Sequence, residues 1–353
     1  METARDTKPA PRLSAGQPRA VGARIAAIAS HFPEHRLTND DLSAIFDWSA
    51  DKIFEKTGIR ERRIAAADET ALDLALKACQ KLISRHVAAA DADFVILCTQ
   101  APDHVLPTSA CILQHRLGLG THVGALDINL GCSGFVYGMS LATGLIASGS
   151  ATSVLLVTAD TYSKFINPAD RSVRTLFGDG AAATLIVADD VARIGPFVFG
   201  TDGNGANALI VPAGGARKAL DAASMAEHTD EFGNVRSDAN LYMDGSAVLN
   251  FSLREVPRVM DTLCNRAHVT KDDFAFIVLH QANKFMLDTL VRKLKISADK
   301  VPYHFDMIGN TVSSTIPVVI ESLMERALLK PGDRYAMIGF GVGLSWAAAA
   351  ITV

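Results

Sequence analysis

The chain has 353 residues, 49% hydrophobic and 20% charged, enough to bury the core of two domains or of one large α/β unit. Its formal net charge of −4 does not favour a nucleic-acid-binding protein, which would carry a basic excess. No apolar run is long enough to cross a membrane. Five widely spaced cysteines without a CxxC pair argue against a disulfide framework or a zinc site, and they favour a reducing compartment such as the cytoplasm.

The predicted elements alternate between strands and helices along the chain. Residues 1–21 are polar and rich in Pro and Ala, which predicts a disordered tail and not a signal peptide. Helical apolar spacing predicts helices over residues 38–46, which Thr38 would cap, 73–86 and 285–297. Apolar runs predict buried strands over residues 23–30, 93–99, 125–130, 153–159, 182–188, 274–280, 335–341 and 346–353. This alternation indicates an α/β fold with covered sheets.

A weak internal repeat divides the chain into halves at 22–190 and 191–353. "DFVILCTQAPD" matches "FAFIVLHQANK", which sets Thr99 opposite His280. About thirty residues further on, "DINLGCSG" and "FDMIGNTV" set Cys132 opposite Asn310, and later "LFGDGAAATLIV" matches "IGFGVGLSWAAAA". Because a duplicated α/β unit brings equivalent helix N-termini together near a pseudo-twofold axis, we expect Cys132, His280 and Asn310 to meet.

Cys132 is the strongest candidate for chemistry. The residues after it form an apolar helix, and unpaired N–H groups at a helix N-terminus stabilise a thiolate and lower its pKa. The alternatives are a buried structural cysteine, a structural histidine at 280 and a helix cap at Asn310. The glycine-rich "GFGVG" is either a tight turn or a close backbone approach to substrate. In the second case a main-chain N–H near Phe340 or Gly341 would join that of Cys132 as an oxyanion hole.

Several motifs together resemble one known family. "KTGIRERRI", "LGCSGFVYG", "LFGDGAAA", "LHQAN", "IGNTVSSTIP" and "GFGVGLSW" are similar to the β-ketoacyl-acyl-carrier-protein synthase III group of the thiolase superfamily. The resemblance implies a thiolase-like α/β fold of five layers, α-β-α-β-α, and a homodimer that uses no metal or redox cofactor. It also implies that an acyl-CoA acylates Cys132. Malonyl on acyl carrier protein would then lose carbon dioxide beside His280 and Asn310 and attack the acyl group.

The same resemblance assigns a channel for coenzyme A. The implied contacts are Lys56, Thr57, Arg171, Gly245, Ser246, Leu249, Ala282 and Asn283, with Phe340 at the acyl pocket. Lys52 stands where many members have the tryptophan that stacks on adenine, and Phe285 stands where some have a basic residue facing the carrier protein. Arg292, Lys293 and Lys295 are candidates to replace that basic residue, or they form a solvated helix face. Segment 214–242 is predicted to be a mobile loop at the channel mouth or an inert excursion.

Three other functions remain possible on sequence alone. A specialised condensing enzyme or acyltransferase of secondary or glycolipid metabolism would share the fold. A papain-like hydrolase would share the Cys-His-Asn set, but "CSGF" is not its expected motif and the duplicated halves are unexplained. A non-catalytic partner subunit would not need all three polar residues.

Overall fold

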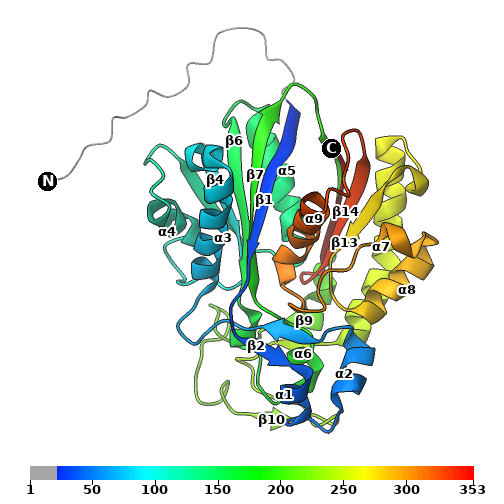
Figure 1. Cartoon of the computed structure of the whole chain (residues 1–353). Coiled ribbons are helices and arrows are strands. Elements are labelled where there is room, and N and C mark those ends of the chain that lie inside the picture. Colours follow the sequence, from blue (N-terminus) through cyan, green and yellow to red (C-terminus); the bar gives the residue numbers. More distant parts are fainter. Residues whose placement is uncertain (1–21) are drawn as a thin grey trace, which may run out of the picture.

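The computed structural model describes residues 22–353, so the predicted tail at 1–21 lies outside the described residues. Five layers stack from one side of the molecule to the other: outer helices, a sheet, a central helix pair, a second sheet and further outer helices (Figure 1). This is the α-β-α-β-α arrangement that the family resemblance implies.

The first sheet has five strands in the order β1-β7-β6-β4-β5. Its strands are β1 (Gly22–His31), β4 (Phe94–Cys98), β5 (Gly124–Ile128), β6 (Ser153–Asp160) and β7 (Gly180–Asp189). β4 is parallel to β5 and β6, whereas β7 is antiparallel to β6 and β1. The carboxyl ends of β4 and β6 therefore meet at one edge, which is also where the chain enters the helix after Cys132.

The second sheet repeats four strands of the first. Its order is β13-β14-β15-β8, with β13 (Phe276–Leu279), β14 (Arg334–Gly341), β15 (Ser345–Thr352) and β8 (Ile194–Thr201). β13 is parallel to β14, and β15 is antiparallel to both neighbours. This order matches β4-β6-β7-β1, so the pairing of 93–103 with 274–284 reflects equivalent strands. Residues 190–193 connect the two sheets.

Helices α5 (Gly134–Ala147) and α9 (Thr315–Glu325) form the central layer between the sheets (Figure 1). α5 is apolar on nearly every side because sheets lie on both sides of it. The outer layers are α3 (Ala71–Arg85) and α4 (Ser109–Arg116) on the first sheet, and α7 (Gly245–Ala267) and α8 (Lys284–Leu294) on the second. The central layer places the N-termini of α5 and α9 near each other at the site.

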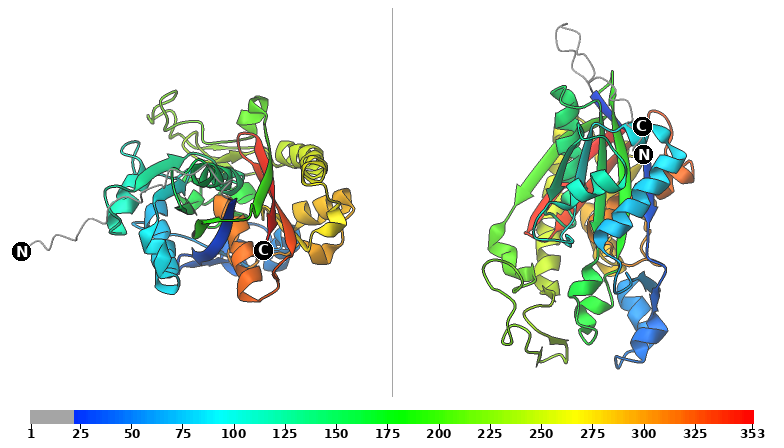
Figure 2. Two further views of the ribbon diagram at one scale, coloured as in Figure 1. Left: turned by 90° about the horizontal axis from the view of Figure 1, so that it is seen from above. Right: turned by 90° about the vertical axis from the view of Figure 1, so that its left-hand side faces the viewer.

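Short elements gather at one end of the molecule, the lower end in Figure 1 and in the right-hand view of Figure 2. They are α1 (Asn39–Ser43), α2 (Ala50–Thr57), α6 (Arg171–Arg174), β2 (Arg36–Thr38), β3 (Glu61–Arg63), β9 (Leu209–Ile210), β10 (His228–Thr229), β11 (Val235–Arg236) and β12 (Tyr242–Met243). Single 3-10 turns lie at Val87–Asp91, Tyr162–Phe165, Gly203–Ala208, Lys271–Asp273, Ala298–Lys300 and Val312–Ser314. The predicted cap is confirmed: Thr38 and Asp41 form a reciprocal capping box before α1.

All eight predicted strands are confirmed, with β5 shorter than predicted, whereas the short strands β2, β3 and β9–β12 were not predicted. β5 ends at Ile128, two residues early, because the chain turns there toward Cys132. β8 was not predicted, because Gly195 and Pro196 interrupt its apolar pattern; as an edge strand it tolerates proline. Within residues 22–353, no helix is both long and apolar enough to cross a membrane.

Candidate active site

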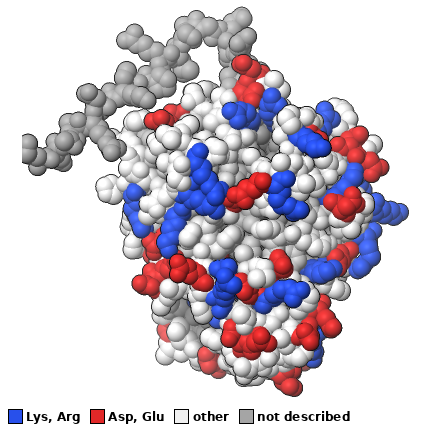
Figure 3. Space-filling view, in the orientation of Figure 1, with Lys and Arg blue, Asp and Glu red and all other residues white. Residues whose placement is uncertain are grey.

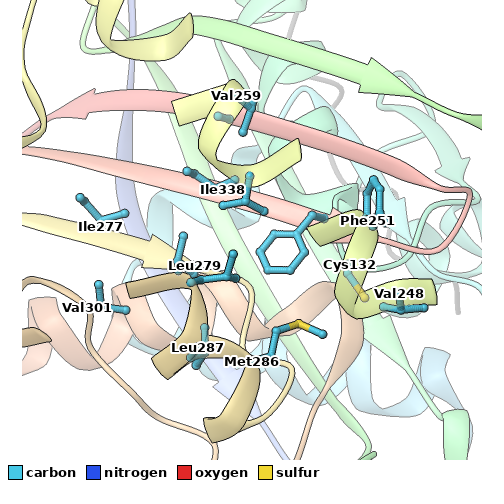
Figure 4. Close-up of a cluster of buried hydrophobic side chains, with 14 of the residues drawn as sticks. Cys132, Val248, Phe251, Val259, Ile277, Leu279, Met286, Leu287, Val301 and Ile338 are labelled. Carbon is cyan, nitrogen blue, oxygen red and sulfur yellow. The ribbon is translucent and has the colours of Figure 1, made fainter. Parts of the chain in front are cut away.

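Cys132 lies in the tight turn that leads from β5 into α5. Its side chain is buried, and the sulfur faces the apolar cluster that includes Val248 and Met286 (Figure 4). α5 begins two residues later at Gly134, where a Cβ would lie 2.2 Å from Cys98 Sγ. Glycine is therefore required there for the turn to pack against β4, and this packing fixes the cysteine at the helix N-terminus.

The turn between β14 and β15, in the second half of the chain, packs against the sulfur of Cys132. The backbone amides of Val342 and of Cys132 itself both act to lower the pKa of the Cys132 thiol. A Cβ on Gly341 would lie 2.9 Å from both Cβ and Sγ of Cys132, so only glycine leaves room for the thiol. Ser133 and Ser345 join their hydroxyls at 2.7 Å beside this contact. The sequence indicated the N–H groups of Cys132 and Gly341 as an oxyanion hole for substrate. It did not indicate that Val342 acts on the sulfur.

The electrostatics of Cys132 differ from the sequence expectation. Burial, together with the nearby Asp160 carboxylate, raises the pKa of the Cys132 thiol to about 12, whereas the helix N-terminus was expected to lower it. Asp160 is itself fully buried, and burial raises the pKa of its carboxyl to about 7. The resting nucleophile is therefore the thiol, and the Val342 N–H and the helix N-terminus can stabilise negative charge only as it develops.

His280 follows the end of β13 and is buried beside the cavity. Its backbone N–H donates to the carbonyl of Ile338 at 2.9 Å, and its Nδ1 lies 2.7 Å from the Thr315 hydroxyl. Phe340 meets the imidazole edge-on, with 5.6 Å between ring centroids. Burial lowers the pKa of His280 to about 3, so the ring is neutral at physiological pH.

Asn310 is held by a strained loop before α9. Its Oδ1 accepts the backbone N–H of Val312 at 2.9 Å, which leaves its NH₂ as the group that can donate to a ligand. Val312 adopts φ = 56°, a left-handed conformation that costs a β-branched residue about 1–3 kcal/mol. Gly309 also has positive φ (78°), and a Cβ there would lie 3.0 Å from Arg62 Cγ and from the backbone N of Gly178.

One cavity of about 70 Å³ brings the three predicted residues together. Cys132, His280 and Asn310 all line it, with Phe340 and Gly341. A wider cavity of about 790 Å³ opens to the surface beside it. The two cavities adjoin, because both are lined by Leu176, Met243, Gly245, Asn283 and Met286. The thiol therefore lies at the inner end of a route from the surface.

The predicted coenzyme A contacts lie along this route. The outer cavity is lined by Lys56, Thr57, Arg171, Gly245, Ser246, Leu249 and Asn283. Ala282 and Phe340 line the inner cavity. Segment 214–242 forms one wall of the outer cavity through residues such as Asp230 and Phe232. It contains β10 and β11. The buried Arg236 anchors it by an ion pair to Asp170 (2.7 Å) and also pairs with Asp230 within the segment (2.8 Å).

The structure adds an aromatic residue that the sequence interpretation missed. Trp48 lines the outer cavity from just before α2, four residues ahead of Lys52, the position where many members have their tryptophan. The Arg171 guanidinium lies 4.6 Å from the centre of its ring system, and the Lys52 and Lys56 ammonium groups lie at 5.0 and 5.3 Å. An aromatic side chain therefore lines this cavity although Lys52 stands at the expected tryptophan position. Trp48 is one of only two tryptophans in the chain, and that was the available signal.

Comparisons with known proteins show which family the chain belongs to. Residues 126–203 match the family model of 3-oxoacyl-[acyl-carrier-protein] synthase III, and residues 264–353 match that of its C-terminal part. β-Ketoacyl-[acyl-carrier-protein] synthase III 2 of Halalkalibacterium halodurans is 37% identical over 92% of this chain and 95% of its own length. The chain belongs to the synthase III family.

Solved structures of synthase III enzymes share the fold. A crystal structure of a 3-oxoacyl-(acyl-carrier-protein) synthase III superposes with a TM-score of 0.93 at 57% identity, covering 94% of this chain and all of that one. A priming β-ketosynthase from the R1128 polyketide pathway superposes with a TM-score of 0.82 at 28% identity, covering 97% and 99%. This synthase III is therefore a condensing acyltransferase, which excludes the papain-like hydrolase and the non-catalytic subunit.

Proposed function

We propose that this synthase III joins an acyl group from acyl-CoA to a malonyl group carried on acyl carrier protein, with Cys132, His280 and Asn310 as its catalytic residues. The observation that carries the proposal is their shared cavity at the inner end of a route lined by Trp48 and Arg171. The proposal divides the reaction into an acylation and a condensation, each using a different part of the cavity.

In the acylation, Cys132 Sγ forms a bond to the thioester carbon of acyl-CoA. The bond from that carbon to the coenzyme sulfur breaks, and the proton of the thiol ends on the departing sulfur. The Val342 N–H and the N-terminus of α5 stabilise negative charge on the attacking sulfur. The thioester oxygen becomes an oxyanion, and the backbone N–H groups of Cys132 and Gly341 are the proposed donors to it.

In the condensation, malonyl thioester loses carbon dioxide and leaves an enolate. Its carbon attacks the acyl group on Cys132, a carbon–carbon bond forms, and the sulfur of Cys132 leaves and regains a proton. Negative charge develops on the malonyl thioester oxygen, where His280 and Asn310 are proposed to donate hydrogen bonds. Removing one such donor typically costs about 10²–10³ in rate. No step changes an oxidation state that would require a redox cofactor, and we propose that none is used and that no metal takes part.

The outer cavity supports coenzyme A as the acyl carrier. Trp48 offers an aromatic face for the adenine, and Lys56 and Arg171 offer cations for its phosphates. Gly245, Ser246, Leu249, Ala282 and Asn283 then line the narrowing part, where the pantetheine arm would lie. Because Lys56 is a point charge and cannot form the bidentate contact of an arginine, we expect it to bind a phosphate less specifically.

The carrier protein is proposed to dock beside α8. Exposed Arg292, Lys293 and Lys295 lie at its C-terminal end, and the exposed Phe285 lies at its first turn on the rim of the outer cavity. Basic and acidic groups alternate over the face shown in Figure 3, so a docking site for an acidic partner depends on this local cluster and not on the net charge.

A homodimer is proposed from the outer edge of β5. In the described part of the chain β5 has a neighbouring strand on one side only, β4, which leaves its other edge open to pair with a second copy. Val105 and Leu106 in the loop between β4 and α4 are 99% and 79% exposed, and Leu141 and Phe199 expose further apolar surface. Sedimentation at several protein concentrations tests this, and Val105→Asp with Leu106→Asp should shift the equilibrium to the monomer.

Its place in the cell is proposed to be the cytoplasm. All five cysteines are free thiols, including the exposed Cys111, and such a set is typical of a reducing compartment.

The division into 22–190 and 191–353 is proposed to mark the two copies of an ancient duplication.

The activity is tested by separating the two half-reactions. Wild-type protein is first incubated with acyl-CoAs of increasing chain length and its mass is recorded. Malonyl-carrier protein or malonyl-CoA is then added, and carbon dioxide and β-ketoacyl product are measured. His280→Ala and Asn310→Ala should retain acylation and lose decarboxylation. Wild-type protein that acylates but gives no product with either malonyl donor would refute the condensation.

A second candidate changes the acceptor or the pathway. Because one similar structure is a priming ketosynthase of polyketide synthesis, a specialised condensing enzyme or an acyltransferase of secondary or glycolipid metabolism fits the same fold. Transfer of the acyl group from the protein to an alcohol or amine, without carbon dioxide release, would favour this candidate.

A further inference from the structure

The segment from Asn310 to Thr315 contains one of the two polar groups proposed for the condensation, the Asn310 amide, and contacts the other, the His280 imidazole. Val312 N–H fixes the amide of Asn310, and the Thr315 hydroxyl touches His280 Nδ1 at 2.7 Å. The segment is tied to the first half by Ser314, whose hydroxyl lies 2.9 Å from that of Thr158. Thr315 itself is buried and does not line the cavity, so it acts on a ligand only through His280.

A neutral imidazole carries one N–H, and its position decides what His280 can do. Since Nδ1 points to Thr315, Nε2 is the nitrogen that faces the cavity. If the proton is on Nδ1, Nε2 can only accept a hydrogen bond; if it is on Nε2, the ring can donate to the malonyl thioester oxygen. The proposed condensation needs the second tautomer, in which Nδ1 must accept.

The Thr315 hydroxyl is the group that can satisfy Nδ1 in that tautomer. It has one hydrogen and two acceptors within reach: Nδ1 of His280 at 2.7 Å and the carbonyl of Val312 at 3.1 Å. A hydroxyl that donates to the carbonyl accepts from Nδ1–H, and one that donates to Nδ1 leaves the proton on Nε2. The shorter of the two contacts is the one to the imidazole.

We propose that Thr315 is a positioning residue that donates its hydroxyl hydrogen to His280 Nδ1 and so presents Nε2–H to the reacting malonyl thioester. The inference rests on the proposed condensation and adds to it the residue that selects the tautomer. The burial that keeps His280 neutral supports it, because a charged ring would carry both protons and need no selection. Phe340, packed edge-on, holds the plane of the ring while Thr315 selects its proton.

The first test compares Thr315→Val with Thr315→Ser. Valine removes the hydroxyl at nearly the same volume, and serine keeps it. Thr315→Val should lower the rate of malonyl decarboxylation by about 10-fold to 100-fold, while acylation of Cys132 stays within about twofold. This is less than the loss of about 10²–10³ for removing an oxyanion donor outright, because the imidazole itself remains. Thr315→Ser should restore decarboxylation. Equal rates for the folded Thr315→Val and wild-type proteins would overturn the inference.

The second test needs no variant at position 315 to fold. Histidine labelled with ¹⁵N is incorporated into the wild-type protein, and the nitrogen signals of His280 are identified among the ten histidines by their loss in His280→Ala. The inference predicts a protonated Nε2 and an unprotonated Nδ1. A protonated Nδ1 would overturn it even if the wild-type enzyme condenses normally. Absence of condensation in the wild type would instead refute the proposed function.

Discussion

Gly341→Ala tests the closeness of the two halves at the nucleophile. The added Cβ would lie 2.9 Å from Cys132 Cβ and Sγ, against an ordinary carbon contact of about 3.5–4.0 Å. The β14–β15 turn and the cysteine must therefore separate by about 0.6–1 Å. Overpacking of this kind costs about 1–3 kcal/mol of folding free energy, and a displacement of about 1 Å at a reacting atom can cost about 10²-fold in rate.

The assay measures both effects against a matched control. Gly144→Ala, in the same helix that begins beside the nucleophile, adds a Cβ with nothing within 4 Å, and it should stabilise the protein by about 0.5–1 kcal/mol. Acylation is followed by intact mass after mixing with acyl-CoA, and stability by urea unfolding. Gly341→Ala should be acylated more slowly than wild type and should have a lower free energy of unfolding. Wild-type acylation and stability in Gly341→Ala would refute the contact on which the site geometry depends.

Three further predictions address the mouth, the loop and the buried carboxyl. Trp48→Ala should raise KM for acyl-CoA about 5-fold to 30-fold with kcat unchanged. The change removes the ring proposed to stack on adenine and the ring that holds the Arg171 guanidinium, together worth about 1–2 kcal/mol. An unchanged KM would exclude Trp48 from the coenzyme site. Arg236→Ala should cost about 3 kcal/mol because it leaves the buried Asp170 unpaired, and limited proteolysis should then cut within 214–242; resistance equal to wild type would contradict the anchoring. Because the pKa of Asp160 is raised to about 7 from 3.8, the folded state binds its proton more tightly than the unfolded state; its contribution is fully present below about pH 4 and is lost as pH rises through about 7. Urea unfolding of Asp160→Asn at a series of pH values should not show this loss of stability. Its Cys132 should also react faster with iodoacetamide at pH 8. The same pH dependence of the free energy of unfolding in Asp160→Asn and wild type would contradict the raised pKa of Asp160.

An α/β fold with covered sheets and two related halves could be predicted from the strand runs and the repeat, whereas the five layers were implied by the family resemblance. Cys132, His280 and Asn310 were predicted to meet because equivalent points of a duplicated unit lie near one axis, and all three line one cavity. β8 was missed because glycine and proline hide an edge strand. Val342 lies in a turn far from Cys132 in the sequence. The residues around Val342 therefore could not show that its backbone amide acts on the sulfur.

The electrostatic expectation failed for a related reason. The sequence shows a cysteine at a helix N-terminus, and the dipole argument follows from that alone. The desolvation that raises the thiol pKa, and the nearness of Asp160 from the end of β6, depend on how two strands and two halves pack. The role of Trp48 could not be predicted from the motif position of Lys52, because the indole reaches the same cavity from four residues earlier, before α2 begins.

The most direct measurement is the site of the acyl group after brief exposure to acyl-CoA. The protein is digested and each of the five cysteine-containing peptides is weighed, with Cys132→Ser as control. The account predicts the added acyl mass on the peptide with the buried Cys132, none on the exposed Cys111, and loss of the label in the control. A label on any other cysteine, with Cys132 unmodified, would contradict it.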